Sequence, residues 1–162
     1  MKPVKMIVAG CANPHMAGYL RSIEDLKGDI EFIALSDSDE ARLNHHRRLV
    51  GDSADLTYYT NMDSMLEAHP DADAIMVGSD NCDHYEMCVK AFQRNLHIYS
   101  MKVVSMDEEE CERLLQLQKK SDRIFQVEFE LHFSPQFTYA RDLVRSGELG
   151  EIKSVYMSNI SQ

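Results

Sequence analysis

The sequence predicts an α/β fold in which a doubly wound, mostly parallel sheet is covered by helices on both faces. Three observations predict it. Short apolar runs of strand length alternate along the chain with longer amphipathic segments of helical spacing. Turn and cap residues separate the two kinds of segment, and no internal repeat or Pro-, Gly- or Ser-rich linker interrupts them. Strands joined through helices favour right-handed crossovers and parallel pairing.

The expected strands are short apolar runs that end at turn or polar residues. The run 4–9, which stops at Gly10, has the composition of a strand buried on both faces. Further strands are expected over residues 30–36, 56–59, 72–77, 96–99 and 124–129. The run 152–158 alternates imperfectly between apolar and polar residues and is expected to form a last strand.

The expected helices lie between these runs and cover residues 14–27, 37–49, 62–68, 83–94, 105–120 and 135–146. Gly28 and Gly51 are typical stop signals, as is Asn95, which tolerates the left-handed conformation. The spacing of Ser105 and Glu108 predicts a capping box at the start of the fifth helix. The two histidines 45 and 46 are expected on the surface of the second helix, without a function.

The alternating pattern is complete near residue 125, yet the chain continues. We therefore expect a first domain over residues 1–125. Residues 126–162 are expected to hold a connecting strand and helix and the first strand of a truncated second α+β domain. That last strand has no partner elsewhere in the sequence, which favours self-association or disorder at this end.

Composition excludes several classes of protein. The 162 residues are 44% hydrophobic and 27% charged, which is typical of a globular protein and allows a sizeable core. A net charge of −10 argues against broad binding of nucleic acid or anionic lipid. No apolar run approaches the ~20 residues of a membrane helix, and no signal peptide is visible, so we expect a cytoplasmic protein. The four cysteines form no CxxC pair and are expected to be free thiols.

The turn after the first strand, Gly10-Cys11-Ala12-Asn13-Pro14-His15, stands where a dinucleotide-binding fold carries G-x-G-x-x-G. Only Gly10 matches, although Ala12 is small enough for fairly close approach of a pyrophosphate. The turn is either a phosphate-binding loop at a helix N-terminus or only a strand–helix connection. Asp37 follows by about 20 residues and could accept the ribose hydroxyls of NAD. It could equally cap the next helix, and the two roles are compatible.

Two further loops follow predicted strands at the edge of the sheet where open α/β folds bind ligands. The first contains Ser79, Asn81 and His84, and we expect His84 to face a nucleotide rather than the core. Carboxylates in this loop are expected to cap a helix, and we expect no metal. The second contains Lys102, which is either a solvated charge or a group that polarises a hydroxyl or carbonyl oxygen.

The order of these loop segments along the chain resembles that of the glucose–fructose oxidoreductase / inositol dehydrogenase (Gfo/Idh/MocA) family. The resemblance extends from Val4 to about Ser158. It is carried by VAGCANPHMAGYL, ALSDSDEAR, DADAIMVGSDNCDHYEMCVKAF, NLHIYSMKVVSM and FSPQFTYARDLVRSGELGEIKSVY. It implies a Rossmann-type domain that binds NAD or NADP, joined to a second domain with an open sheet. Members typically oxidise or reduce a hydroxyl of sugars, inositols or related polyols.

Carried over position by position, the resemblance implies roles for individual residues. Those implied to bind the cofactor are Gly10, Ala12, Asn13 and His15 at the pyrophosphate, Asp37 at the adenosine ribose, Ser79, Asn81 and His84 beside the dinucleotide, and Met101 and Lys102 near the nicotinamide. Lys102 matches the lysine of the family's Glu-Lys-Pro signature and is the implied catalytic residue. The chain departs from that signature with Met101 in place of Glu and Val103 in place of Pro, which is often a cis proline in the family.

The first interpretation is the nucleotide-binding portion of an NAD(P)-dependent oxidoreductase acting on a sugar-like small molecule. The broken signature motivates the alternative of a non-catalytic NAD-binding or regulatory module, and a plain interaction domain is a third reading. We expect NAD rather than NADP, because Asp37 would oppose a 2′-phosphate and the nearest arginine, Arg42, lies a turn into the next helix. We expect little or no turnover from this chain alone, because the second domain of family members usually supplies further catalytic groups. A homo-oligomer is compatible with the sequence but not specified by it.

Overall fold

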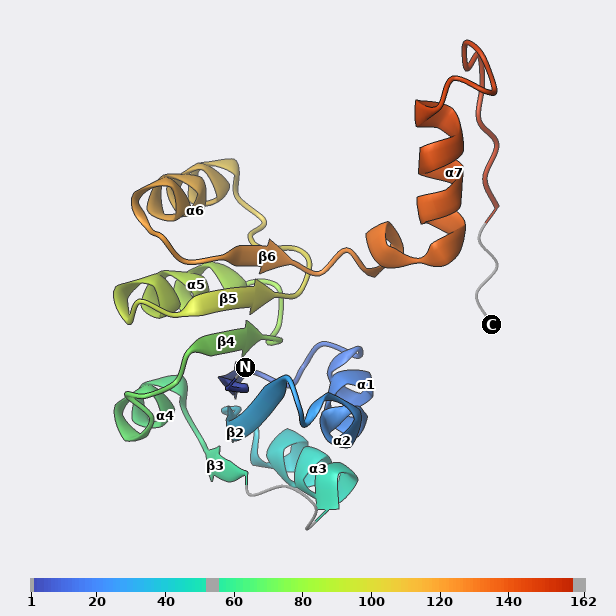
Figure 1. Ribbon diagram of the computed structural model, residues 1–162. Helices are drawn as coiled ribbons and strands as arrows, with labels where there is room; N and C mark the ends of the chain where they lie inside the picture. Colours follow the sequence, from blue (N-terminus) through green and yellow to red (C-terminus); the bar gives the residue numbers. More distant parts are fainter. Residues whose placement is uncertain (1, 52–55, 159–162) are drawn as a thin grey trace. The chain divides into compact units, whose positions relative to one another are not determined.

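The computed structural model of the protein describes residues 2–51 and 56–158. In these residues six strands form one parallel sheet of order β3-β2-β1-β4-β5-β6 (Figure 1). The strands are β1 (Val4–Ala9), β2 (Ile30–Ser36), β3 (Thr57–Tyr59), β4 (Ala74–Val77), β5 (His97–Ser100) and β6 (Phe125–Val127). This order is that of the doubly wound Rossmann fold, so the predicted fold class is confirmed. All six strands of the predicted sheet are present, and β3, β4 and β6 are shorter than the runs that predict them.

The helices are α1 (Met16–Arg21), α2 (Ile23–Leu26), α3 (Glu40–Val50), α4 (Met62–Ala68), α5 (His84–Gln93), α6 (Glu108–Lys120), α7 (Pro135–Arg145) and the 3₁₀ helix η2 (Glu130–Phe133). The single helix expected over residues 14–27 is two short helices, separated at Ser22. Asn95 has the expected left-handed φ of 58° after α5.

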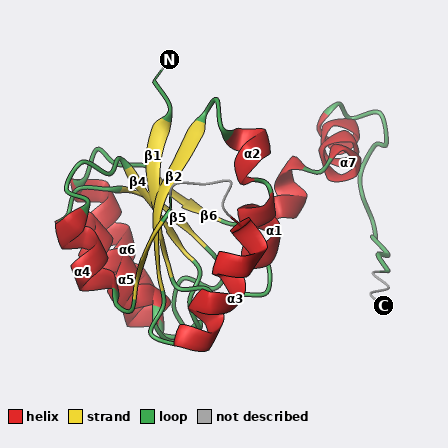
Figure 2. Ribbon diagram, turned by 90° about the horizontal axis from the view of Figure 1, so that it is seen from below, coloured by secondary structure: helices red, strands yellow, loops and turns green. Residues whose placement is uncertain are grey.

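Alternation along the central strands divides the core into two layers. In β1, Met6 and Val8 pack into the apolar cluster that contains Leu20 of α1 and Leu43 of α3. Their neighbours Ile7 and Ala9 point to the other face of the sheet, because successive side chains of a strand alternate. There they join a second cluster formed with α4, α5 and α6. Figure 2 shows α1–α3 on one face of the sheet and α4–α6 on the other.

The cap at the start of α6 differs from the predicted capping box of Ser105 and Glu108. The N-cap is Asp107, whose carboxylate accepts a hydrogen bond from the main-chain N–H of Glu110. Ser105 accepts from the N–H of Asp107 and donates from its hydroxyl to the carboxylate of Glu110. The sequence contains two overlapping cap patterns, and the later one begins the helix, so Ser105 pairs with Glu110 and not with Glu108.

The chain divides into two compact units, Met1–Glu128 and Phe129–Gln162. Because β6 pairs with β5, the first unit extends three residues beyond the boundary expected from the sequence. The second unit contains η2 and α7, and neither element has a buried residue. The strand expected over 152–158 is wrong: residues 151–158 have no strand structure, and the described part of this unit holds no strand with which they could pair.

Candidate dinucleotide site

The loops that follow β1 and β4 meet at the point where the strand order reverses. Gly10 has a φ of +81°, and a Cβ added to it would lie 2.5 Å from main-chain atoms of Ser79. Only glycine fits this conformation and this approach. The N–H of Asn13 donates to the carbonyl oxygen of Gly78 at 2.9 Å and ties the two loops together. In an open α/β sheet this crevice is where ligands bind.

Gly78 is a residue of the site that sequence reasoning missed. A Cβ at this position would lie 2.3 Å from the sulfur of Met16, the first residue of α1. In the G-x-G-x-x-G pattern the third glycine allows the helix to pack closely against the sheet. Here His15 occupies that position, and close packing comes instead from Gly78, the residue that follows the neighbouring strand β4. The Val-Gly-Ser sequence that ends β4 is the only local signal that could have indicated it.

Four of the residues expected at the cofactor line one hollow of about 320 Å³ beside these loops: Ala12, Asn13, Ser79 and Asn81. Pro14, Asp80, Cys82 and Met106 also line it, and Cys82 and Met106 are exposed. The carboxamide oxygen of Asn13 accepts from the N–H of His15 at 3.0 Å, which holds the turn before α1 in shape. The structure therefore brings these predicted residues together on the surface of one crevice.

The carboxylate of Asp37 is not free to bind a ribose, contrary to the expectation from the sequence. Its side chain is 3% exposed, and both oxygens are occupied by the protein. One oxygen accepts from the N–H of Cys11 at 2.7 Å, and the other accepts from the N–H of Asp39 at 2.8 Å. The guanidinium of Arg42 contacts both oxygens through Nε, at 3.1 and 3.2 Å. Asp37 thus joins the ends of β1 and β2 and the first turn of α3.

The expectation that no arginine stands at the side of Asp37 is also corrected. Although Arg42 lies five residues later, the first turn of α3 brings its side chain back over the carboxylate. A hydrogen bond from Arg42 to Asp37 raises the pKa of the guanidinium above its ordinary value, and Asp39 and Asp80 add to this. One arginine is therefore surrounded by three carboxylates, with distances of 3.7 Å to Asp39 and 3.9 Å to Asp80.

A second hollow, of about 250 Å³, lies between the ends of β1, β2 and β4. Its wall carries more acidic than basic side chains: Asp37, Asp63, Asp80, Asp83 and Glu86 against Arg42 and Lys90. Lys90 is itself paired with Asp63 at 2.8 Å. The hollow is acidic as a whole, so an additional anionic group placed there would be repelled.

The prediction that His84 faces a nucleotide is wrong. Its side chain is fully buried, and its two ring nitrogens lie within hydrogen-bond distance of the carbonyl oxygens of Ser79 and Val103. The ring therefore braces the loop after β4 against the loop after β5. Met101 is fully buried as well and packs in the apolar cluster with Val8 and Met16, so it presents no polar group to a cofactor. The Lys102–Val103 peptide bond is cis although Val103 is not proline.

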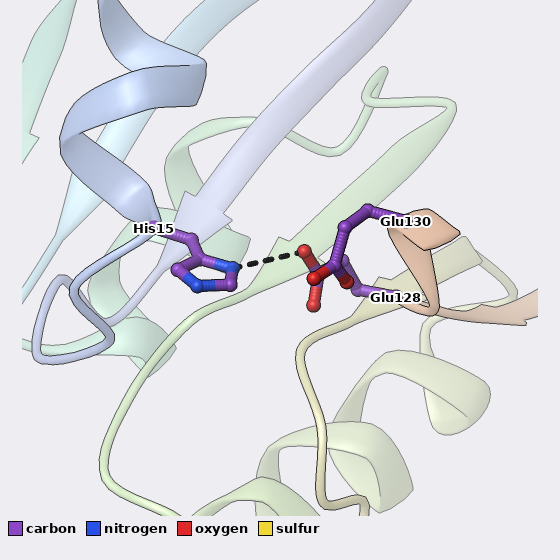
Figure 3. A group of neighbouring side chains, drawn as sticks. All are labelled: His15, Glu128 and Glu130. Carbon is purple, nitrogen blue, oxygen red and sulfur yellow. Dashed lines mark hydrogen bonds and ion pairs between the residues drawn. The ribbon is translucent and has the colours of Figure 1, made fainter. Parts of the chain in front are cut away.

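Lys102 ends beside a buried carboxylate that the sequence did not indicate. Its amino group lies 2.6 Å from Oε2 of Glu128, the residue that follows β6. The other oxygen of Glu128 contacts Nδ1 of His15 at 3.0 Å (Figure 3) and accepts from the hydroxyl of Tyr19 at 3.2 Å. Tyr19 also hydrogen-bonds Tyr99 at 2.9 Å. Burial, followed by the contacts with Tyr99 and Glu128, raises the pKa of Tyr19 above its ordinary value.

His46 is buried, which corrects the expectation that both adjacent histidines lie on the surface. Its Nε2 lies 3.2 Å from the carbonyl oxygen of Cys11, and within the described residues its buried Nδ1 has no hydrogen-bond partner. Burial lowers the pKa of His46. Burial likewise raises the pKa of the Cys11 thiol to about 12. His45, in contrast, is exposed.

The strand order, the glycine turn after β1 and the crevice at the switch point define a dinucleotide-binding domain of the Rossmann class. A family model described as an oxidoreductase family with an NAD-binding Rossmann fold, GFO_IDH_MocA, matches residues 4–129. The chain belongs to this family. Among the described residues, no helix is both long enough and apolar enough to span a bilayer.

Three similar proteins illustrate the relationship. An uncharacterized oxidoreductase of Rhizobium meliloti is 28% identical over 156 residues, which are 96% of this chain and 45% of that protein. Myo-inositol 2-dehydrogenase of Thermotoga maritima is 26% identical over 130 residues, 79% of this chain and 38% of that protein. The structure of scyllo-inositol dehydrogenase from Lactobacillus casei with bound NAD(H) and scyllo-inositol shares the fold, with a TM-score of 0.77 and 21% identity. The match covers 93% of this chain and 43% of the scyllo-inositol dehydrogenase chain. The chain thus spans less than half the length of these relatives.

Proposed function

We propose that this chain is the nucleotide-binding portion of an NAD(H)-dependent oxidoreductase that acts on a hydroxyl or carbonyl group of a sugar- or polyol-like molecule. The observation that carries the proposal is the approach of Gly10 to Ser79 at the switch point, in a family of NAD-binding oxidoreductases. This approach brings main-chain atoms of the two loops together at the crevice, as the glycines of a dinucleotide-binding turn do for a pyrophosphate. The inositol dehydrogenases among the similar proteins support the substrate class.

In this proposal the dinucleotide lies across the two hollows. The loop residues Ala12 and Asn13, with Ser79 and Asn81, border the pyrophosphate. The adenosine occupies the acidic hollow beside Asp37. Because both oxygens of Asp37 are already bound by the protein, Asp37 shapes this end of the site and Arg42 covers it. His15 and His84 act through the shape of their loops, His84 from within the core.

Charge supports NAD over NADP. A 2′-phosphate would enter a hollow in which Asp37, Asp39 and Asp80 surround a single arginine. An arginine that is engaged by a buried carboxylate has little capacity left to neutralise a phosphate. The three carboxylates together, and not Asp37 alone, would therefore disfavour the 2′-phosphate.

Lys102 is the residue we assign to the chemistry. It follows β5 at the edge of the sheet that carries the crevice, and its side chain is 36% exposed, so its amino group is accessible to a substrate oxygen. The dinucleotide would supply or accept the hydride. We further propose that catalysis requires groups beyond this chain, because holding two reacting carbons in contact supplies roughly 7–11 kcal/mol of the barrier reduction.

Fluorescence titration with NADH and NADPH tests the proposal. We expect NADH to bind, and NADPH to bind at least about tenfold more weakly. Asp80→Asn should narrow the difference in affinity between NADH and NADPH, because it removes one of three carboxylates around Arg42. The matched control is Asp122→Asn, which changes an exposed carboxylate in the turn before β6 and should leave this difference in affinity unchanged. Tighter binding of NADPH would overturn the cofactor assignment, and binding of neither would overturn the nucleotide function.

The alternative function is a non-catalytic NAD-binding module. The observation that favours it is Met101, a core residue where the family signature has a carboxylate. An absorbance assay for NADH formation or consumption over a panel of sugars and inositols, run on any longer product of the same gene, separates the two. Turnover that Lys102→Ala abolishes supports the enzyme, and NADH binding without turnover on any of them supports the module.

A further inference from the structure

Glu128 is a fully buried carboxylate with a separate partner on each oxygen. Its side chain is 1% exposed, whereas those of Lys102 and His15 are 36% and 44% exposed. Oε2 lies 2.6 Å from the Lys102 amino group, and Oε1 contacts His15 at 3.0 Å and Tyr19 at 3.2 Å. Tyr99 adds to this group through Tyr19, because the two hydroxyls lie 2.9 Å apart.

The position of Glu128 is fixed by the sheet. Its N–H donates to the carbonyl oxygen of Ser100 at 2.8 Å, which extends the pairing of β5 and β6 by one residue. The side chain is thereby placed next to the residues that follow β5. Met101, immediately before Lys102, is apolar and buried, so the carboxylate beside Lys102 comes from the neighbouring strand and not from the preceding residue.

The environment of Glu128 also determines the charge of its partners. A buried carboxylate is costly unless it is paired and hydrogen-bonded. Here the Lys102 ammonium, the Tyr19 hydroxyl and a ring nitrogen of His15 contact it, and this arrangement favours a charged pair of carboxylate and ammonium. Lys102 in this pair has protons to donate and no lone pair with which to accept one.

We propose that Glu128 is a positioning residue that holds Lys102 as an ammonium, so that Lys102 acts as the proton donor to the oxygen of a bound carbonyl. In the step that follows, the carbonyl carbon gains a hydride with its electron pair from the reduced dinucleotide, and the carbonyl oxygen gains a proton from Lys102. The neutral amine of Lys102 then regains a proton from water, and the product is an alcohol. This reaction role rests on the proposed function, whereas the charge state of Lys102 does not.

Acylation of lysines by an amine-selective reagent, followed by mass spectrometry, reads out that charge state because only the neutral amine reacts. The test uses the 162-residue chain without dinucleotide. In Glu128→Gln we expect acylation of Lys102 at pH 7–8 to be faster by about tenfold or more, because the opposite charge that favours the ammonium is removed. Glu112→Gln, an exposed glutamate on α6, should leave the rate unchanged.

The pH dependence of the two acylation rates shows whether Glu128→Gln changes the charge of Lys102 or only the access of the reagent to its amino group. If Glu128 holds the ammonium, the ratio of the two rates falls as pH rises toward 10, where more of the wild-type amine is neutral. A ratio below about twofold at pH 7–8, or one that stays constant with pH, would overturn the proposal.

A wild-type comparison serves if Glu128→Gln does not fold. Lys90 has a similar exposure of 41%, but its partner Asp63 is 62% exposed. Exposed ion pairs are weak because water screens them. Lys102 should therefore be acylated markedly more slowly than Lys90, and equal rates would contradict the proposal. Failure of NADH binding in the titration above would leave these rates unaffected, so the two failures are distinguishable.

Discussion

Gly10 and Ser79 approach so closely that no side chain fits between the loop after β1 and the loop after β4. A Cβ at Gly10 would lie 2.5 Å from the N, Cα and Cβ atoms of Ser79, which is less than any real carbon contact allows. The two loops belong to adjacent parallel strands on either side of the switch point. Their contact therefore forms the floor of the proposed dinucleotide site.

We predict that Gly10→Ala lowers both stability and NADH affinity. The added methyl group overlaps Ser79, and alanine disfavours a φ of +81°. Positive-φ strain and overpacking each cost about 1–3 kcal/mol, so the free energy of unfolding should fall by at least about 2 kcal/mol. Urea denaturation measures this. The control is Gly18→Ala in α1, where a Cβ meets nothing within 4 Å and alanine should stabilise the helix by about 0.5–1 kcal/mol. Equal effects of the two substitutions would contradict the account.

We predict that Asp37→Ala acts mainly on stability. The substitution leaves the N–H groups of Cys11 and Asp39 without their acceptor and leaves Arg42 without its buried partner. A buried donor without a partner costs about 1–3 kcal/mol, so we expect a loss of about 2–4 kcal/mol in urea denaturation. Asp39→Ala removes the N-cap of α3 and a half-exposed contact with Arg42 at 3.7 Å, and it should cost about 1 kcal/mol. A loss from Asp37→Ala no larger than that from Asp39→Ala would show that the carboxylate is not a structural brace.

We predict that His46 contributes to loss of stability in acid. Burial lowers its pKa in the folded protein, so below its ordinary value near 6.5 the unfolded chain binds the proton more readily. The contribution of neutral His46 to the free energy of unfolding is complete above pH 6.5. It is lost as pH falls from there toward the folded-state pKa, by at most about 1.4 kcal/mol per pH unit. His46→Leu should flatten the decline of unfolding free energy between pH 7 and 5. The exposed neighbour provides the control, since His45→Leu should keep the wild-type slope. Identical slopes in all three proteins would refute the assignment.

The buried thiols should be protected from alkylation in the folded protein. Burial raises the pKa values of Cys11 and Cys88 to about 12, and both side chains are buried. Cys82 is exposed, although the carboxylate of Asp83 raises its pKa. Iodoacetamide at pH 8 should therefore modify Cys82 well before Cys11 or Cys88, as mass spectrometry of the native protein would show. Early labelling of Cys11 would mean that the end of β1 is open to solvent.

The elements that local patterns specify were predictable from the sequence. Every strand of the sheet overlaps an apolar run of the sequence, and in the central strands β1 and β4 alternate residues are buried on the two faces. Parallel pairing follows from strands that are joined through helices. The expected strand over 152–158 failed because alternation alone does not supply a hydrogen-bonding partner. The capping box failed because two overlapping patterns begin within three residues of each other.

The site was predictable in part, and its long-range contacts were not. The glycine turn and the loop after β4 are local features, and they meet as expected. Glu128 lies 113 residues from His15 and 26 from Lys102, so no local pattern could indicate their cluster. The engagement of Asp37 by Arg42 depends on the rotation of α3 relative to β2. Gly78 acts through its packing against Met16, which is visible only in three dimensions.

Protection of Cys82 by NAD⁺ tests the central claim most directly. Cys82 lies in the wall of the hollow assigned to the pyrophosphate, while Cys111 lies on α6 outside both hollows. If the dinucleotide binds in the crevice between the loops after β1 and β4, saturating NAD⁺ should slow alkylation of Cys82 severalfold and leave the rate at Cys111 unchanged. An unchanged rate at Cys82, under conditions in which NAD⁺ is shown to bind, would place the dinucleotide elsewhere and contradict the account.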